Sequence, residues 1–227
     1  MPLQHSSALS IAFFTDMLDV CVMIYLDDIL IYSNDTASHR KHVREVLQHL
    51  HTNGLYLKPE KCEWHSETVK YLGYILLPSG LSMAHDKIQT IQDWPEPRKV
   101  NNIQSFLGFA NFYWRFIQDY SGIVVPLTRL TRKEVPWNFS DNCRKSFNCL
   151  KEVFISTPVL VHWTLDTPIT IETDTSDYAI ASILSLTCSD NEIHPIMFYS
   201  CMLSRAKLNY NTHDKEPLAI FEAFNSW

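Results

Sequence analysis

The chain has 227 residues, of which 46% are hydrophobic and only five are glycine. This composition is typical of a folded protein with a buried core, and it excludes a disordered chain. No apolar run approaches the roughly 18 to 20 residues that span a bilayer, and the N-terminus lacks a charged segment followed by an apolar core. We therefore expect a soluble intracellular protein, in the cytoplasm or nucleus, that is neither secreted nor bound to a membrane.

The charge is distributed unevenly along the chain. Nineteen basic and 25 acidic side chains give a net charge of −6, which argues against a protein that binds nucleic acid through its total charge. Residues 98–133, however, carry a net charge of +5, whereas residues 161–227 carry −6. The middle segment is therefore the part of the chain that is suited to phosphate groups.

The six cysteines, at positions 21, 62, 143, 149, 188 and 201, include no CxxC pair. Three of them, Cys21, Cys62 and Cys201, lie within or beside apolar runs. We expect reduced, buried thiols.

In the first third of the chain, the patterns predict a helix, a hairpin, a second helix and short strands. Residues 1–19 carry Phe13, Phe14, Met17 and Leu18 in helical spacing. Two β-prone runs then predict a hairpin over residues 20–32 with acidic side chains at its tip. An amphipathic helix follows between residue 34 and Gly54, and short strands joined by turns are expected at 55–57, 58–62 and 69–76.

The rest of the chain reads first as helical and then as strands. Two prolines in the sequence Trp94-Pro95-Glu96-Pro97 exclude a continuous helix at that point. Apolar stripes predict helices over 100–110, 126–130 and 143–154. Strand-like alternation begins at Ile169 and recurs at 180–186 and 196–203, before a last helix that begins near Asp214. These elements predict the α+β fold class.

Asp27 and Asp28 are adjacent carboxylates at the tip of the predicted hairpin. Two such groups repel each other, and proteins offset the repulsion with water or with a hard divalent cation. The pair therefore predicts a magnesium site for phosphoryl transfer. The alternative is that Asp-Asp is merely a polar turn, because short motifs also occur by chance.

Residues 25–33, YLDDILIYS, resemble the polymerase active-site hairpin of reverse transcriptases from gypsy-type LTR retrotransposons. Further segments follow in the family's order. They are the H-x-x-H-V stretch of His39 and His42, the pair Lys61-Cys62, the primer-grip-like sequence Tyr71-Leu72-Gly73-Tyr74, and the thumb-like sequences at 105–108, 111–113 and 115–117. The resemblance implies that Asp27 and Asp28 hold catalytic Mg²⁺ or Mn²⁺ and that Tyr25, Leu72 and Gly73 contact nucleic acid.

Two departures bear on polymerase activity. The resembled enzymes take a third aspartate from a strand well upstream of the hairpin, whereas only Asp16 and Asp19 precede Asp27 in this chain. Residues 3–9, LQHSSAL, stand where the family has F-G-L-x-N-A-P. We therefore expect this chain alone to be inactive in DNA synthesis.

A second resemblance lies near the C-terminus. Residues 171–177, IETDTSD, resemble the D-A-S strand of the retrotransposon RNase H domain, and residues 209–220 resemble its N-Y…K-E-L-L-A-I helix. This implies that Asp174 and Glu216 are metal ligands for cleavage of the RNA–DNA hybrid, with Pro217 tolerated in the first helical turn. Ala181-Ser182 and Leu186 replace the family's usual Gly-Gly and Gln.

The basic segment 98–133 interleaves cations with aromatic residues. We expect Phe106, Phe109 and Phe116 to belong to the core. The plausible contacts to the nucleic-acid backbone are Arg115, Arg129, Arg132 and Lys133.

Together these observations predict three segments: part of a reverse transcriptase palm at 1–93, a thumb-like or connection-like helical segment at 94–160, and the first half of an RNase H-like domain at 161–227. The implied activities are RNA-directed DNA polymerase and ribonuclease H, which act on an RNA template, a DNA primer and their hybrid. One alternative is a non-catalytic, retrotransposon-derived relic that binds nucleic acid or protein. A weaker one is a zinc site made by His39, His42, Cys62 and His65, whose spacing matches no common zinc motif.

Overall fold

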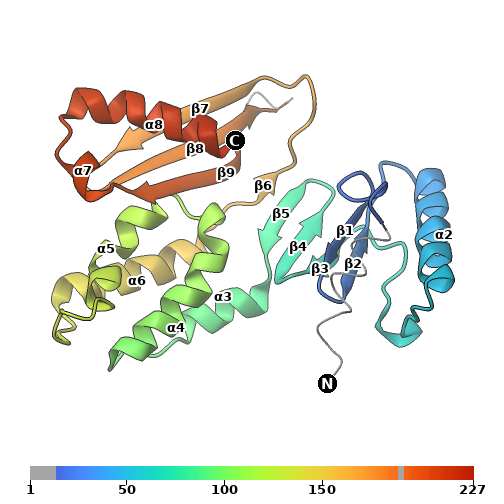
Figure 1. Ribbon diagram of the computed structural model, residues 1–227, viewed down its shortest axis with the longest axis horizontal. Helices are drawn as coiled ribbons and strands as arrows, with labels where there is room; N and C mark the ends of the chain where they lie inside the picture. Colours follow the sequence, from blue (N-terminus) through green and yellow to red (C-terminus); the bar gives the residue numbers. More distant parts are fainter. Residues whose placement is uncertain (1–13, 189–191) are drawn as a thin grey trace. The chain divides into compact units, whose positions relative to one another are not determined.

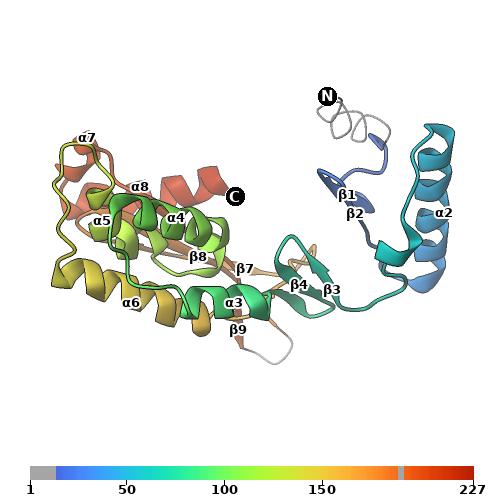
Figure 2. The same ribbon diagram turned by 90° about the horizontal axis from the view of Figure 1, so that it is seen from below.

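The computed structural model describes residues 14–188 and 192–227. It confirms the predicted α+β class and divides into two compact units, residues 1–66 and 67–227, which Figures 1 and 2 colour from blue to red along the chain. Each unit is described by itself. The predicted division into segments 1–93, 94–160 and 161–227 stays a prediction.

The first unit is a β-hairpin packed on one helix. Strands β1 (Val22–Tyr25) and β2 (Asp28–Ile31) pair antiparallel, as the sequence predicts. Helix α2 (Thr36–Thr52) begins after Asp35, whose carboxylate accepts hydrogen bonds from the N–H groups of Ala37 and Ser38 at 2.8 and 2.9 Å. This N-cap satisfies two of the donors that a helix end leaves without partners.

Two predictions for the first unit are wrong in the described residues. Residues 14–21 form turns and an isolated bridge between Leu18 and Val22 but no helix, while residues 1–13 of that prediction lie outside the described part. Residues 55–62 form no strand. Instead, Pro59–Lys61 is the short 3₁₀ helix η1, because proline lacks an N–H for a strand ladder and its fixed φ suits the first turn of a helix.

The second unit contains two antiparallel sheets. The first has the order β3 (Val69–Tyr71), β4 (Tyr74–Leu77), β5 (Gly80–Met83) and β6 (Leu160–Val161). The strand predicted over 69–76 is therefore two strands, separated by a turn at Leu72 and Gly73. The second sheet has the order β7 (Ile169–Thr175), β8 (Ala179–Thr187) and β9 (Ile193–Met202), close to the predicted strands.

The main helical segment lies between β5 and β6 of the first sheet, and two further helices follow β9. In order, the helices are α3 (His85–Gln92), α4 (Val100–Ala110), the 3₁₀ helix η2 (Asn111–Phe116), α5 (Tyr120–Leu130), α6 (Asp141–Ile155), α7 (Arg205–Leu208) and α8 (Thr212–Ser226). The helices predicted at 100–110 and 143–154 are confirmed. Helix α5 begins six residues before the predicted start, since Asp119 caps it by accepting the N–H of Gly122. No helix in the described part of the chain is both long and apolar enough to cross a membrane.

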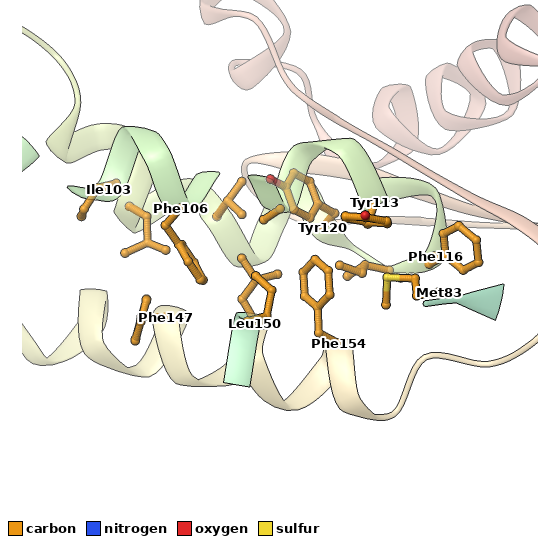
Figure 3. Close-up of a cluster of buried hydrophobic side chains, with 14 of the residues drawn as sticks. Met83, Ile103, Phe106, Tyr113, Phe116, Tyr120, Phe147, Leu150 and Phe154 are labelled. Carbon is orange, nitrogen blue, oxygen red and sulfur yellow. The ribbon is translucent and has the colours of Figure 1, made fainter. Parts of the chain in front are cut away.

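One hydrophobic core joins the helical segment from α3 to α6 to both sheets of the second unit. Rings from α4, η2 and α6 meet in it, among them Phe106, Tyr113, Phe147 and Phe154 (Figure 3). Phe116 is buried in the same core and Phe109 is packed against it, as predicted. Leu160 of β6 and Phe198 of β9 belong to this core too, so the second sheet is packed against the helical segment.

The opposite face of the second sheet is covered by α8. Ile180 of β8 lies at 0% exposure in a cluster with Leu203 and with Ala219 of α8. Both faces of the sheet are thus covered at least in part. Helix α8 begins two residues earlier than predicted, which places Pro217 inside the helix rather than in its first turn. The six cysteines are free; Cys21 is buried as predicted, whereas Cys62 and Cys201 are only partly buried.

Candidate active site and nucleic-acid interface

The tip of the β1–β2 hairpin is a two-residue turn formed by Leu26 and Asp27. Tyr25 pairs with Asp28 across it, and Leu26 adopts a left-handed φ of 53°. A positive φ at the first turn position belongs to the tight hairpin turns whose twist matches that of the strands, although glycine is the residue that adopts it without strain. The geometry therefore projects Asp27 beyond the ends of both strands.

Strand alternation decides where Asp28 lies. Val22 pairs with Ile31 and Ile24 pairs with Ile29, and these four residues pack with Val46 and Leu50 of α2. Asp28 and its partner Tyr25 lie on the other face of the hairpin, where Tyr25 is 50% exposed. Asp27 and Asp28 are both exposed, so the hairpin presents two carboxylates and a tyrosine away from its core.

Carboxylate oxygens are the ligands that Mg²⁺ and Mn²⁺ prefer, and the donor type at this tip fits such an ion. Within residues 14–188 and 192–227, no group of three or more His, Cys, Asp or Glu side chains is arranged to hold a metal ion. Of the predicted polymerase site, the described residues offer two candidate ligands, Asp27 and Asp28, and their role stays a prediction.

The predicted primer-contact turn is the connection between β3 and β4. Tyr71 pairs with Tyr74, and between them Leu72 and Gly73 have φ values of 52° and 80°. Two successive positive φ values are characteristic of the type I′ hairpin turn. The turn is partly exposed and is fixed at its base by a hydrogen bond of 3.0 Å from the N–H of Ala84 to the carbonyl of Gly73.

The four predicted backbone contacts are all exposed. Arg115 lies in η2, with its guanidinium carbon 5.5 Å from the ring centroid of Trp114. Arg129 lies in the last turn of α5, and Arg132 and Lys133 follow that helix. The short connection after α5 is held by hydrogen bonds from the N–H of Arg132 to the carbonyl of Arg129 and from the N–H of Val135 to the carbonyl of Arg132. Three cations therefore lie around the end of one helix.

Asp174 and Glu216 come from neighbouring elements, β7 and α8. Asp174 pairs with Ala181, whereas Thr175 pairs with Ile180, the residue that packs against α8. Alternation therefore directs Asp174 to the sheet face opposite the one that α8 covers. Glu216 is exposed on α8. That these two carboxylates hold one ion stays a prediction.

The negative charge of Asp174 acts on another carboxylate, that of Asp119. Burial raises the pKa of Asp119 at the start of α5, and the negative charge of Asp174 raises it further, while the hydrogen bond from the Gly122 N–H lowers it. Sequence reasoning missed this pair, because Asp119 appears in the sequence only as the single acid of the basic segment. Residues 55 positions apart in the chain show no pattern that would join them.

The histidines of the zinc alternative do lie near one another in the first unit. Ser33 Oγ is 2.7 Å from His42 Nδ1 and 3.3 Å from His39 Nδ1, and the rings of His39 and His65 meet edge to face at 5.3 Å. Cys62 does not join them as a ligand, since its thiol donates to the carbonyl of Lys58 at 3.3 Å. Hydrogen bonding to Ser33 and ring packing account for these side chains without a metal ion.

Comparison with known proteins identifies both resembled regions. Residues 4–76 match the reverse transcriptase (RNA-dependent DNA polymerase) family, and residues 139–227 match the RNase H-like domain found in reverse transcriptase. The Tf2-3 and Tf2-7 transposon polyproteins of Schizosaccharomyces pombe are each 35% identical to this chain over 206 residues, or 91% of it. The chain spans only 16% of the length of these polyproteins.

Solved structures support the fold. A foamy viral protease-reverse transcriptase in complex with double-stranded DNA superposes with a TM-score of 0.80 at 18% identity, over 97% of this chain and 38% of the other. A foamy viral protease-reverse transcriptase in complex with an RNA/DNA hybrid gives a TM-score of 0.77 at 18% identity, over 96% and 30% of the two chains.

Proposed function

We propose a role in RNA-directed DNA synthesis, because this chain belongs to the reverse transcriptase and RNase H-like part of gypsy-type LTR retrotransposon polyproteins. The chain would contribute the polymerase hairpin, the thumb and an RNase H-like region to an RNA-directed DNA polymerase. Its partners would be an RNA template, a DNA primer and the hybrid that they form. The observation that carries the proposal is the hairpin tip, where a tight turn projects Asp27 beyond the strands and Asp28 lies exposed on the face opposite α2.

The chemistry assigned to the hairpin depends on its rigidity. A bound divalent ion would lower the barrier by stabilising the charge that develops on the transferred phosphoryl group. The chain's own part is to hold Asp27 and Asp28 at fixed positions, which it does through the strand pairing and the packing of β1 and β2 on Val46 and Leu50. Tyr25, half exposed opposite Asp28, offers its ring to a base or sugar.

The cations of the second unit would hold the duplex. Arg115, Arg129, Arg132 and Lys133 are exposed and can neutralise phosphates, and the partly exposed Leu72–Gly73 turn offers backbone without a bulky side chain at its second position. In the RNase H-like region, Asp174 and Glu216 are the candidate metal ligands for hybrid cleavage. Their carboxylates suit Mg²⁺ or Mn²⁺ in donor type.

Primer extension tests the polymerase role. We expect no measurable synthesis from this chain alone on a primed RNA template with Mg²⁺, since the described residues supply two ligands of the site. Fusion to the segment that precedes the matched region in a Tf2 polyprotein should restore synthesis, and Asp27→Asn should then abolish it. Asp93→Asn, at an exposed carboxylate after α3, is the matched control and should leave synthesis unchanged. Synthesis that survives Asp27→Asn in the fusion would overturn the assignment.

Salt dependence tests the nucleic-acid surface. Affinity for an RNA–DNA hybrid should fall as salt is added, and replacing Arg115, Arg129 and Arg132 by glutamine should reduce the slope of log K against log salt by about 2 to 3. The control replaces three other exposed basic residues by glutamine. They are Arg40, Lys41 and Arg44 of α2. An equal effect of the two triple variants would place the contact elsewhere.

A non-catalytic relic is the second candidate. It is favoured by one observation, namely that residues 14–188 and 192–227 form no cluster of three metal-binding side chains. This candidate would be supported if the fusion with the Tf2 segment binds the RNA–DNA hybrid but synthesises no DNA.

A further inference from the structure

The Leu72–Gly73 turn is packed against a group of aromatic rings from η2. A Cβ atom at Gly73 would lie 2.5 Å from the hydroxyl oxygen of Tyr113, closer than real side chains approach, and 3.3 Å from Cε of Lys87. Tyr113 is only 3% exposed and lies in the core of the second unit (Figure 3). Its hydroxyl is therefore directed at the backbone of the turn.

Tyr113 has little freedom to move away. Its ring meets those of Phe109, Phe112 and Phe154 at centroid distances of 5.5, 5.0 and 6.1 Å. Edge-to-face and tilted contacts at such distances are the arrangements that aromatic pairs prefer. Burial raises the pKa of Tyr113 to about 12, so the hydroxyl stays protonated at neutral pH.

The strand that leaves the turn is held by the same group. Tyr74 lies between Phe112 and Phe116, stacked on both with centroid distances of 5.5 and 5.4 Å. Its hydroxyl donates a hydrogen bond of 3.0 Å to the carbonyl of Phe112. Both the turn and its outgoing strand thus rest on one 3₁₀ helix.

We propose that Tyr113 is a positioning residue, which sets the place of the Leu72–Gly73 turn relative to η2 and so fixes the angle at which the turn meets the primer. The inference rests on the proposed function for the identity of the ligand, but its structural part does not. Glycine at 73 is required both by the φ of 80° and by the nearness of the Tyr113 hydroxyl, and these two requirements can be separated.

A double-substitution cycle separates them. Gly73→Ala introduces backbone strain, a clash with the Tyr113 hydroxyl and a close approach to the Lys87 side chain. In combination with Tyr113→Phe the clash with the hydroxyl is removed, whereas the strain and the approach to Lys87 remain the same. We expect Gly73→Ala to lower the midpoint of thermal unfolding clearly more in the wild-type background than in the Tyr113→Phe background. Gly54→Ala is the matched control, since Gly54 has a similar φ of 69° and no atom within 4 Å of the added Cβ. Its effect should be the same in both backgrounds. Equal effects of Gly73→Ala in the two backgrounds would overturn the proposal.

Photocrosslinking tests whether the turn contacts the primer. The full chain is bound to an RNA template annealed to a DNA primer that carries 4-thiothymidine near its 3′ end, and the yield of the crosslink to residues 71–74 is measured. Tyr113→Phe should keep this yield within about twofold, because the ring still supports the turn. Tyr113→Leu should reduce the yield several-fold. The affinity for the hybrid should not fall comparably, because the exposed arginines supply it.

The outcomes distinguish the two proposals. If the wild-type chain binds no hybrid, the proposed function fails while the substitution cycle still decides the role of Tyr113. If the wild-type chain crosslinks through the turn and Tyr113→Leu crosslinks equally well, the positioning role fails while the proposed function stands.

Discussion

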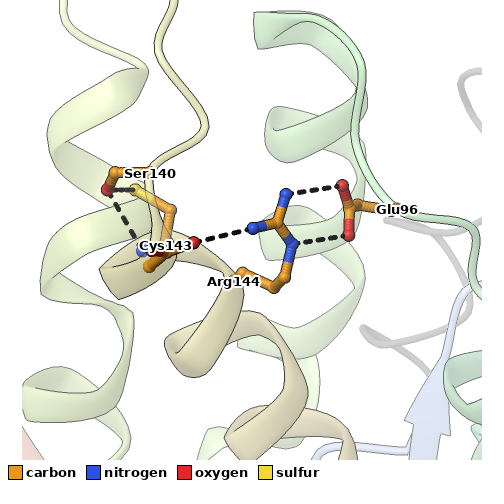
Figure 4. A network of polar contacts seen from close by, with 5 residues as sticks. Glu96, Ser140, Cys143 and Arg144 are labelled. Carbon is orange, nitrogen blue, oxygen red and sulfur yellow. Dashed lines mark hydrogen bonds and ion pairs between the residues drawn. The ribbon is translucent and has the colours of Figure 1, made fainter.

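Arg144 of α6 binds Glu96 through two hydrogen bonds, from Nε at 3.0 Å and from Nη2 at 3.3 Å (Figure 4). A third N–H, on Nη1, reaches Asp141 at 2.9 Å. Because Glu96 lies between the two prolines that precede α4, this guanidinium ties α6 to the segment that leads into the thumb-like helices. Lys151 strengthens the same connection by donating to the carbonyl of Trp94 at 2.9 Å.

We expect Arg144→Lys to lower the midpoint of thermal unfolding slightly. Lysine keeps the positive charge but cannot form the two parallel hydrogen bonds, and the effect is small because the pair is exposed to solvent. Added salt should shrink the difference between the two proteins. Lys145→Arg, at the neighbouring exposed position, serves as the control and should have no effect. An unchanged midpoint for Arg144→Lys would mean that the two parallel hydrogen bonds add no stability beyond that of the charge.

Ser182 should be replaceable by alanine with a gain in stability. Its hydroxyl is buried, at 2% exposure, and has no hydrogen-bond partner among the described residues. Removing a buried donor that lacks a partner should raise the free energy of unfolding by about 1 to 3 kcal/mol. Urea unfolding of Ser182→Ala measures this.

Ser200 on the next strand provides the matched control. It is also buried, but its hydroxyl accepts the N–H of Ser121 at 2.9 Å and donates to the Ser121 hydroxyl at 3.2 Å. Ser200→Ala should therefore lower the free energy of unfolding by about 1 kcal/mol. If both substitutions destabilise the protein, the Ser182 hydroxyl has a partner such as an ordered water.

The sequence predicts the elements of this fold better than their contacts. The hairpin at 20–32 and the helices at 100–110 and 143–154 follow from apolar periodicity, which is a local signal. The turn at Leu72 and Gly73 was hidden within an apolar run, although a glycine flanked by strand-forming residues is a signal for a hairpin.

In the candidate site, too, local features could be predicted and long-range contacts could not. The exposure of Asp27 and Asp28 could be predicted, because it depends on a hairpin whose strands are adjacent in sequence. The contact between Tyr113 and Gly73, and the influence of Asp174 on Asp119, could not, since each joins segments 40 or more residues apart. Such pairs are set by tertiary packing, for which a single sequence carries no periodic signal.

Asp119→Asn should stabilise the protein at neutral pH. The pKa of Asp119 is raised in the folded state, chiefly by burial. A carboxyl with a raised pKa favours folding below its unfolded pKa, and this contribution is lost as the pH rises through the folded pKa. Asparagine still accepts the N–H of Gly122 and tolerates the φ of 51° at this position. We expect a small gain at pH 7 that vanishes below the ordinary pKa of 3.8.

The control for this prediction is the N-cap of α2. The pKa of Asp35 is lowered, first by its hydrogen bond with the Ser38 side chain, so the ionised form stabilises the folded state. Asp35→Asn should therefore reduce stability at pH 7, the opposite sign to Asp119→Asn. Thermal unfolding at pH 7 and pH 3 measures both. A loss of stability for Asp119→Asn at pH 7 would show that the charge of Asp119 has a favourable partner.

We expect acid to lower the stability of the first unit before that of the second. Burial lowers the pKa of His39, and the charges of His65 and His42 lower it further. A histidine with a lowered pKa stabilises the fold above its unfolded pKa, near 6.5, and this stability is lost as the pH falls through the folded pKa. Protonation would also place positive charge in the second turn of α2, near its positive N-terminal end, and beside two other imidazoles.

Amide hydrogen exchange can follow this loss, provided that protection factors are corrected for the intrinsic pH dependence of exchange. Between pH 6.5 and pH 5, the protection of α2 should fall, because the pKa of His39 is lowered in the folded state, while that of β8 stays constant. His39→Gln should flatten the change in α2, because the neutral amide does not titrate. His85→Gln, at the exposed start of α3, is the control and should leave it unaltered. Equal pH dependence of α2 in wild type and His39→Gln would locate the acid-sensitive group elsewhere in the first unit.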